Sequence, residues 1–285
     1  MIKLNKNKTY LITGGAGFLG KALVERLYSD DYTLRVIGRD EGSLVALKEK
    51  FPKVEIYTGD ISDLFEVRQA MKGVSGVFHL AASKHVGLAE VYVRENIKTN
   101  VIGSLNIYNE SLNSEIEFVL AISTDKAAQV AGVYGATKLL MERLGSQFEK
   151  LNPNCKYRTV RYGNVLYSTG SVLCKWKDLI QEGKGVIVTE PQATRFFWTI
   201  DQAVDLIEDC MENATDNIPH CPSMKSMRVD DLLTAMIEKY SNGIDIPVKI
   251  IGLQPGENLH EKVLNEGPYS NEVDQFTIEE IKELI

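Results

Sequence analysis

Tyr134 and Lys138 carry side chains whose types and spacing suit acid–base chemistry. They stand at positions i and i+4 at the start of a strongly helical stretch, so a helix places the phenol and the ammonium group on one face. Free tyrosine titrates near ~10 and is a poor base at neutral pH until a nearby cation stabilises its phenolate. The pair therefore suits removal of a proton from a hydroxyl group. Because a Tyr-x-x-x-Lys spacing is common by chance, its weight depends on the segments around it.

A second polar segment, Thr124, Asp125 and Lys126, comes ten residues earlier, where a predicted buried strand ends. Open α/β sheets place their chemistry at the carboxyl ends of strands. An acid and an amine beside a hydroxyl suit elimination, in which one group protonates a departing hydroxyl and the other removes a carbon-bound proton beside a carbonyl. Asp125 must then be protonated and Lys126 neutral, and we expect burial to favour both neutral forms. The alternative is an exposed Asp–Lys pair in a loop.

A glycine-rich segment near the N-terminus predicts a phosphate-binding loop. It follows a predicted strand and opens a predicted helix, and comprises Thr13, Gly14, Gly15, Ala16, Gly17, Phe18, Leu19 and Gly20. Glycine lets the backbone turn tightly and approach phosphate, and a helix N-terminus offers unpaired N–H groups. We therefore expect the pyrophosphate of a dinucleotide to bind here, with a plain tight turn as the alternative.

The end of the second predicted strand indicates which dinucleotide binds. It carries Arg39 followed by Asp40. An acidic residue at this place accepts from the ribose 2′-hydroxyl of NAD, whereas arginine suits the 2′-phosphate of NADP. Arg39 therefore predicts NADP, and the alternative is an ordinary exposed arginine beside a helix.

The order of strands and helices predicts an α/β fold. Short β-branched runs alternate with helical patterns, which is typical of a parallel sheet covered by helices. The expected strands are residues 9–13, 33–37, 54–58, 76–81, 117–123 and 157–161, and the expected helices are residues 18–29, 43–50, 63–71, 90–112 and 133–150. We expect a Rossmann-type doubly wound parallel sheet in residues 1–163 and a smaller C-terminal substrate-binding part in residues 164–285, with the chain able to cross between the two.

Composition and charge exclude several classes of function. The chain of 285 residues has 39 acidic and 32 basic residues, which argues against a general nucleic-acid-binding surface. Its four cysteines show no CxxC spacing and no ligand pair has zinc-like spacing, so we expect reduced thiols and no metal. Because no signal peptide and no run of eighteen apolar residues is present, we expect a cytoplasmic protein without a membrane span.

Several motifs together resemble the extended short-chain dehydrogenases, and within them the polysaccharide-biosynthesis 4,6-dehydratases of the inverting UDP-N-acetylglucosamine type. The motifs are the glycine loop and residues 78–86, 98–103, 123–128, 134–138, 161–165, 194–196 and 255–261. The likeness covers roughly residues 8–265. This chain departs from the pattern at Gly87, where proline is usual, at Asn258, where lysine is usual, and in its short tail.

The resemblance implies NADP as cofactor, a UDP-sugar as substrate and a homo-oligomer. Thr124 would orient the 4-hydroxyl, Tyr134 with Lys138 would be the oxidation base, Asp125 the acid for the 6-hydroxyl and Lys126 the base at C5. The cofactor would also contact Asp60, Ile61, Ala81, Ala82, Lys84 and Asn100. The nucleotide sugar would contact Lys84, His85, Asn164, Arg195 and Glu257.

Chemistry alone leaves other interpretations of three of these residues open. Asp60 is nearly as well explained as a helix cap, and Asp63 is a second candidate for that cap. Asn100 is comparably well explained by hydrogen bonds to neighbouring backbone. Arg195, expected in a loop after Pro191, offers the fork-like cation that a diphosphate needs.

Two other functions remain as alternatives to the dehydratase. A UDP-sugar 4-epimerase or 4-reductase would use the same Tyr134 and Lys138, but it has no need of Asp125 and Lys126. A non-catalytic NADP-binding sensor would keep the glycine loop but has no reason to retain Thr124, Tyr134 and Lys138 together.

Overall fold

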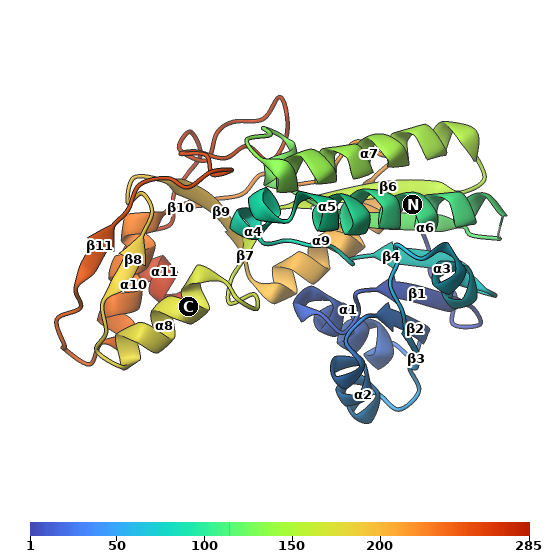
Figure 1. Cartoon of the computed structure of the whole chain (residues 1–285), viewed down its shortest axis with the longest axis horizontal. Coiled ribbons are helices and arrows are strands. Elements are labelled where there is room, and N and C mark those ends of the chain that lie inside the picture. Colours follow the sequence, from blue (N-terminus) through green and yellow to red (C-terminus); the bar gives the residue numbers. More distant parts are fainter. Residues whose placement is uncertain (114) are drawn as a thin grey trace.

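The computed structural model describes residues 1–113 and 115–285, and its centre is a six-stranded parallel sheet (Figure 1). The strands are β1 (Thr9–Thr13), β2 (Thr33–Gly38), β3 (Glu55–Thr58), β4 (Gly76–His79), β5 (Phe118–Thr124) and β6 (Lys156–Tyr162). Their spatial order is β3-β2-β1-β4-β5-β6. The order reverses between β1 and β4, and ligands of such sheets bind at the carboxyl ends beside this reversal. The predicted Rossmann-type fold is confirmed.

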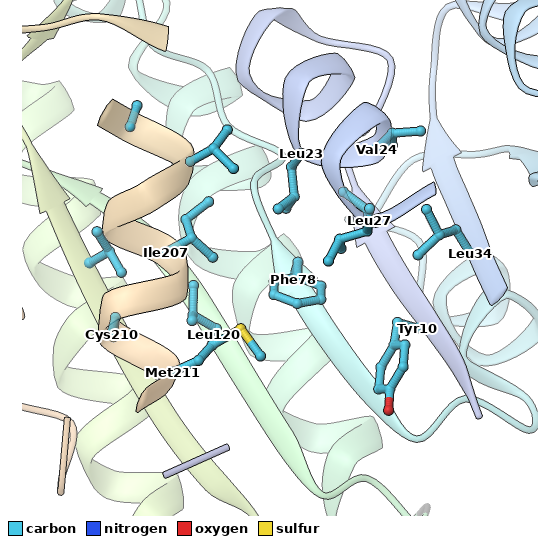
Figure 2. Close-up of a cluster of buried hydrophobic side chains, with 14 of the residues drawn as sticks. Tyr10, Leu23, Val24, Leu27, Leu34, Phe78, Leu120, Ile207, Cys210 and Met211 are labelled. Carbon is cyan, nitrogen blue, oxygen red and sulfur yellow. The ribbon is translucent and has the colours of Figure 1, made fainter. Parts of the chain in front are cut away.

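Helices cover both faces of the sheet because each buries an apolar stripe against it. One face packs against α1 (Phe18–Ser29), α2 (Glu41–Lys50) and α9 (Ile200–Asn213). The other packs against α3 (Leu64–Met71), α6 (Gly103–Asn113) and α7 (Val133–Leu151). Figure 2 shows side chains of α1 and α9 over Tyr10, Phe78 and Leu120 of the sheet. Since α9 lies beyond residue 163, the chain crosses back onto the sheet, and the division at residue 163 stays a prediction.

The connection between β4 and β5 differs from the expected helical stretch over residues 90–112. It consists of α4 (Val86–Val91), α5 (Val93–Asn96), the π-helix η1 (Ile97–Ile102) and α6. Tyr92 breaks the helix between α4 and α5, with φ −106° and ψ 55°. Within η1, Asn100 faces inward and binds backbone of the loop after β4, at Ser83. The π-helix therefore lies where the chain contacts that loop. The spacing of apolar residues does not reveal this departure from a regular α-helix.

The C-terminal part lies to one side of the parallel sheet and has a small core of its own (Figure 1). Its elements are β7 (Asn164–Val165), α8 (Val172–Gln181), β8 (Val186–Val188), β9 (Thr194–Trp198), β10 (Ser226–Arg228), α10 (Val229–Tyr240), β11 (Val248–Ile250) and α11 (Ile278–Leu284). The 3₁₀-helix η2 (Asp125–Ala127) is not among them, because it directly follows β5 of the central sheet. The strands β10, β9 and β7 form one sheet, and β11 pairs with β8. Because β7 follows β6 almost directly, this part begins at the carboxyl edge of the central sheet.

Candidate active site

A cavity of about 870 Å³ runs from the glycine loop, past the carboxyl ends of β5 and β6, into the C-terminal part. Its wall includes most of the residues that the sequence singles out. These are Gly14, Gly17, Phe18, Leu19, Gly20, Arg39, Asp40, Asp60, Ile61, Ala81, Ala82, Lys84, His85, Thr124, Lys126, Tyr134, Lys138, Asn164, Arg195 and Glu257. One cavity therefore joins the predicted dinucleotide loop to the predicted acid–base groups.

The glycine loop has the backbone that a phosphate cradle needs. Gly14 has a φ of +68°, and a Cβ there would lie 2.9 Å from the Cα of Ala81. A Cβ on Gly20 would collide with the carbonyl oxygen of Gly14. Gly17 is the N-cap of α1, so the first free N–H groups of that helix lie beside the cavity. The glycines Gly14 and Gly20 therefore let the loop turn tightly and pack against its own backbone and that of Ala81 at the helix N-terminus.

Three aspartates follow strands β2 and β3: two of them cap helices, and the third faces the cavity. Asp40 caps α2 by accepting from the backbone N–H of Ser43 at 2.7 Å. Asp63 caps α3, which settles the open question of that cap. Asp60 is left facing the cavity, and its Oδ2 atom lies 3.8 Å from Arg39 Nη1. The Arg39 side chain is 62% exposed, so it is available to a ligand.

Tyr134 and Lys138 project from the first turns of α7 into the cavity. Burial raises the pKa of Tyr134 to about 12, although the Lys126 cation and the Thr124 hydroxyl act in the opposite direction. Burial lowers the pKa of Lys138 to about 8, and Glu142 partly offsets this. At neutral pH the free protein therefore holds a protonated phenol beside an ammonium group, and further positive charge is needed to make the phenolate.

Thr124 ends β5, and Asp125 and Lys126 begin η2, so their side chains meet at one point. The Asp125 Oδ1 atom accepts hydrogen bonds from the Thr124 hydroxyl at 2.9 Å, from the Lys126 N–H at 2.8 Å and from the Lys126 ammonium at 3.0 Å. Among the described residues, the buried Asp125 Oδ2 atom has no partner. A buried acceptor without a donor is costly, which fits an atom that hydrogen-bonds a ligand.

Lys126 lies in a cluster of four charged side chains, called here the Lys126 cluster: Asp125, Lys126, Arg195 and Glu261. The Lys126 ammonium lies 3.0 Å from Asp125 Oδ1 and 3.5 Å from Glu261 Oε1. Burial alone lowers the pKa of Lys126, but the two carboxylates outweigh burial and the net shift is upward. Burial thus favours the neutral amine as expected, but in the free protein the neighbouring carboxylates keep Lys126 an ammonium group.

Three of the expected site residues are buried behind the cavity wall: Thr13, Asn100 and Asp125. The Asn100 side chain accepts from the N–H of Ser83 at 2.8 Å and donates to the carbonyl of Ser83 at 2.9 Å. These are backbone hydrogen bonds of the kind that the sequence left open for Asn100. The Thr13 hydroxyl lies 2.8 Å from Nδ1 of His79. Burial lowers the pKa of His79 to about 3, so this link stays neutral. Thr13 and Asn100 thus shape the backbone of the wall.

The residues expected to hold a nucleotide sugar all line the same cavity. Lys84, His85, Asn164 and Glu257 all contribute to its wall, and burial lowers the pKa of Lys84. Arg195 lies in strand β9, which corrects the expectation of a loop. Its Nη1 atom donates to the carbonyl oxygens of Thr194 and Leu259, each at 2.9 Å.

Sequence reasoning missed several parts of the wall, two of which are informative. Residues 168–171, with Val172 and Leu173 at the start of α8, line the cavity although they carry no charged side chain. Glu261 also lines it and lies within the conspicuous segment at residues 255–261, so a search for carboxylates in that segment would have found it. The loop at residues 168–171 offered no comparable signal.

Comparison with known sequences places the chain in a family. The model described as polysaccharide biosynthesis protein matches residues 10–283. A protein of Methanocaldococcus jannaschii named as an uncharacterized membrane protein is 38% identical over 92% of this chain and 81% of its own length. In the part that the structure describes, no helix has the length and apolar character needed to cross a membrane.

Two further relatives carry enzyme names. A UDP-glucose 4-epimerase of Rickettsia akari is 33% identical over 91% of this chain and 78% of its own. A UDP-N-acetylglucosamine 4,6-dehydratase (inverting) of Campylobacter jejuni is 34% identical over 90% of this chain and 78% of its own.

Solved structures show the same fold. Pen from Bacillus thuringiensis superposes with a TM-score of 0.87 at 32% identity, over 92% of this chain and 82% of Pen. The dTDP-glucose 4,6-dehydratase DesIV from Streptomyces venezuelae, solved with NAD and TYD bound, gives a TM-score of 0.79 at 18% identity, over 88% of this chain and 86% of DesIV. The chain belongs to the polysaccharide biosynthesis protein family, within the extended short-chain dehydrogenases that act as nucleotide-sugar dehydratases and epimerases.

Proposed function

We propose that the protein is an NADP-dependent 4,6-dehydratase that converts UDP-N-acetylglucosamine to a UDP-4-keto-6-deoxy-N-acetylhexosamine. The observation that carries this proposal is the acid–amine pair of Asp125 and Lys126: Lys126 lines the cavity with Tyr134, and the buried Asp125 lies behind it, 3.0 Å from the Lys126 ammonium. Tyr134 and Lys138 suffice for oxidation and reduction at C4. Only the loss of water across C5 and C6 requires a further acid and a further base, which Asp125 and Lys126 can supply.

The cavity fits a dinucleotide on structural grounds. The tight glycine turn at Gly14 and Gly20 and the N-terminus of α1, both at the cavity wall, would hold its pyrophosphate. Arg39 would hold a 2′-phosphate, because its exposed guanidinium offers a planar, charged donor at the cavity wall. Held there, NADP⁺ would supply reversible hydride transfer for the sugar.

The protein's own residues would move the protons of this cycle. Tyr134 removes the proton of the 4-hydroxyl, with Thr124 orienting that hydroxyl and Lys138 stabilising the phenolate. The resulting ketone acidifies C5, and the Lys126 amine removes the C5 proton. Asp125 gives its proton to the 6-hydroxyl, which leaves as water. As C6 is reduced, the Lys126 ammonium would return a proton to C5. The proton that Tyr134 took from the 4-hydroxyl would pass to the Asp125–Lys126 pair, which restores all three groups for the next cycle.

Lys126 and Asp125 reach the required state by one proton transfer. In the free protein the ammonium of Lys126 donates to Asp125 Oδ1 at 3.0 Å. When this N–H bond breaks and an O–H bond forms on Asp125, the pair becomes an amine and a carboxylic acid, with no proton gained or lost overall. The ion pair is thus the resting form of the proposed base and acid.

A UDP-sugar 4-epimerase is the second candidate, favoured by the Rickettsia akari relative of that name. Thr124, Tyr134 and Lys138 would serve it equally well. Products separate the two reactions, because an epimerase returns an isomer of unchanged mass whereas a dehydratase returns a product that has lost one water. We expect purified protein incubated with NADP⁺ and UDP-N-acetylglucosamine to convert the sugar to a product that has lost one water. Mass spectrometry of the product measures this loss. An unchanged mass with an inverted C4 would contradict the proposal.

Arg39→Ala tests the choice of cofactor. Removing the guanidinium takes away the planar donor for the 2′-phosphate, and one charged hydrogen-bonding group is worth about 1.5–3 kcal/mol. We expect wild-type protein to bind NADP⁺ more tightly than NAD⁺, and the variant to lose roughly 10- to 100-fold of that preference. Calorimetric titration of both cofactors measures the ratio. A ratio that stays the same in Arg39→Ala would refute the assignment.

A further inference from the structure

Glu261 is a buried carboxylate at the cavity to which the proposed steps give no role. Its side chain is 1% exposed. Its N–H donates to the Ser270 hydroxyl at 2.9 Å, and its carbonyl oxygen accepts from the Ser270 N–H at 2.8 Å. The Ser270 hydroxyl also lies 2.6 Å from the hydroxyl of Thr194 in β9. The backbone of Glu261 is thus fixed against the strand that carries Arg195.

The two oxygens of the Glu261 carboxylate face different groups. Oε2 accepts a hydrogen bond from the Asn258 side chain at 3.2 Å. Oε1 lies 3.5 Å from the ammonium of Lys126 and 4.0 Å from Nε of Arg195. Glu261 therefore stands between the cation proposed to act at C5 and the cation proposed to hold the diphosphate.

The charges of the Lys126 cluster balance only if Glu261 is counted. With Asp125 and Glu261 ionised, two carboxylates face the cations of Lys126 and Arg195, whose side chains are 15% and 11% exposed. Without the Glu261 charge, one cation in this buried site has no counter-charge, and burial then favours loss of a proton from Lys126. Tyr134 also faces Lys126, but its phenol is uncharged at neutral pH.

We propose that Glu261 is a positioning residue that holds Lys126 in place and keeps in the site the one proton that Asp125 and Lys126 share. This inference rests on the proposed dehydratase function, because only elimination uses that proton. If the pair loses it to solvent, an aspartate and an amine remain, and no group can protonate the departing 6-hydroxyl. The negative charge of Glu261 opposes this loss.

Glu261→Gln removes the charge and keeps the size of the side chain. A carboxylate within about 4 Å of an ammonium group shifts its titration by one unit or more. Proton loss from the pair should thus begin at lower pH. The alkaline side of kcat/KM also falls with loss of the Lys138 ammonium, whose pKa is about 8, so the effect of Glu261→Gln should appear as a further alkaline limb that moves to lower pH. Above the wild-type midpoint, we expect kcat/KM for water loss to fall roughly tenfold relative to wild type. At lower pH the difference should be smaller.

A titration without substrate tests the same point independently of turnover. In the full chain with NADP⁺ bound and lysine labelled with ¹⁵N, NMR follows the Lys126 nitrogen, assigned by its loss in Lys126→Met. We expect its midpoint to be lower in Glu261→Gln than in wild type. Glu266→Gln is the matched control, because it removes the same charge from an exposed residue outside the cavity. This control should keep both the midpoint and the limb.

An unchanged Lys126 midpoint in folded Glu261→Gln would overturn the inference. If that variant does not fold, Glu261→Asp replaces it, because the charge remains but a shorter side chain no longer reaches Lys126 as well. We expect Glu261→Asp to lower kcat and to keep the alkaline limb near its wild-type place, and unchanged kcat and KM would refute positioning. Absence of water loss from wild-type protein would instead refute the dehydratase function and leave the lysine titration standing.

Discussion

Tyr134→Phe is expected to lower turnover by roughly two to four orders of magnitude, the usual contribution of a positioned acid–base group. The ring keeps its packing at the start of α7, but the oxygen that takes the proton of the 4-hydroxyl is gone. Burial raises the pKa of Tyr134 to about 12, and the Lys126 ammonium opposes this shift. In the proposed reaction the Lys138 ammonium and a bound cationic ring would further favour the phenolate. Steady-state rates of water loss measure the effect.

Binding of NADP⁺ should survive in Tyr134→Phe, which distinguishes loss of chemistry from loss of fold. Tyr240→Phe is the matched control: its hydroxyl bonds Tyr167 at 2.9 Å in the C-terminal part, and it does not contribute to the cavity wall. We expect near-normal turnover for the control. Turnover near the wild-type level in Tyr134→Phe would remove this residue as the oxidation base.

Lys126→Met is expected to abolish exchange of the C5 hydrogen with solvent, and with it the loss of water. A thioether fills a similar volume but cannot accept the proton. Oxidation at C4 depends on Tyr134 and Lys138, so reduced cofactor should still form when nucleotide sugar is added. Absorbance follows the reduced cofactor, and NMR of the recovered sugar in deuterated water follows exchange at C5.

The control for Lys126→Met is Lys225→Met, which removes an ammonium group bound to Glu280 away from the cavity. We expect this control to keep both exchange and water loss. Continued exchange at C5 in Lys126→Met at the wild-type rate would show that another group is the base. Asp125→Asn should impair water loss as well, because an amide is a far weaker acid than a carboxyl group.

Local sequence patterns predicted the central sheet well. The expected strand over residues 9–13 and helix over residues 18–29 coincide with β1 and α1. Apolar alternation and a glycine loop are set by neighbouring residues, so one chain segment contains the whole signal. The prediction of one helical stretch over residues 90–112 was wrong for the opposite reason. The π-helix in this stretch forms beside the loop at Ser83, which lies outside it in the sequence.

The site was predictable in its residues but not in its charges. Residue types and spacing singled out Thr124, Tyr134 and Lys138, and all three line one cavity. The protonation of Lys126 depends on the adjacent Asp125 and also on Glu261, which comes from a distant segment of the chain and meets Lys126 only in the fold. Burial of Lys126 alone argued for an amine, and the partner carboxylates reversed that argument. The expected homo-oligomer stays a prediction.

The position of solvent deuterium in the product tests the dehydratase function most directly. Wild-type protein turning over UDP-N-acetylglucosamine with NADP⁺ in deuterated water should give a 4-keto-6-deoxy sugar with deuterium at C5, because that proton is removed and replaced. In a second sample, deuterium placed at C4 of the substrate should appear at C6 of the product. NMR and mass spectrometry read both labels. A C4 epimer that keeps all its oxygens and carries no label at C5 would contradict the account.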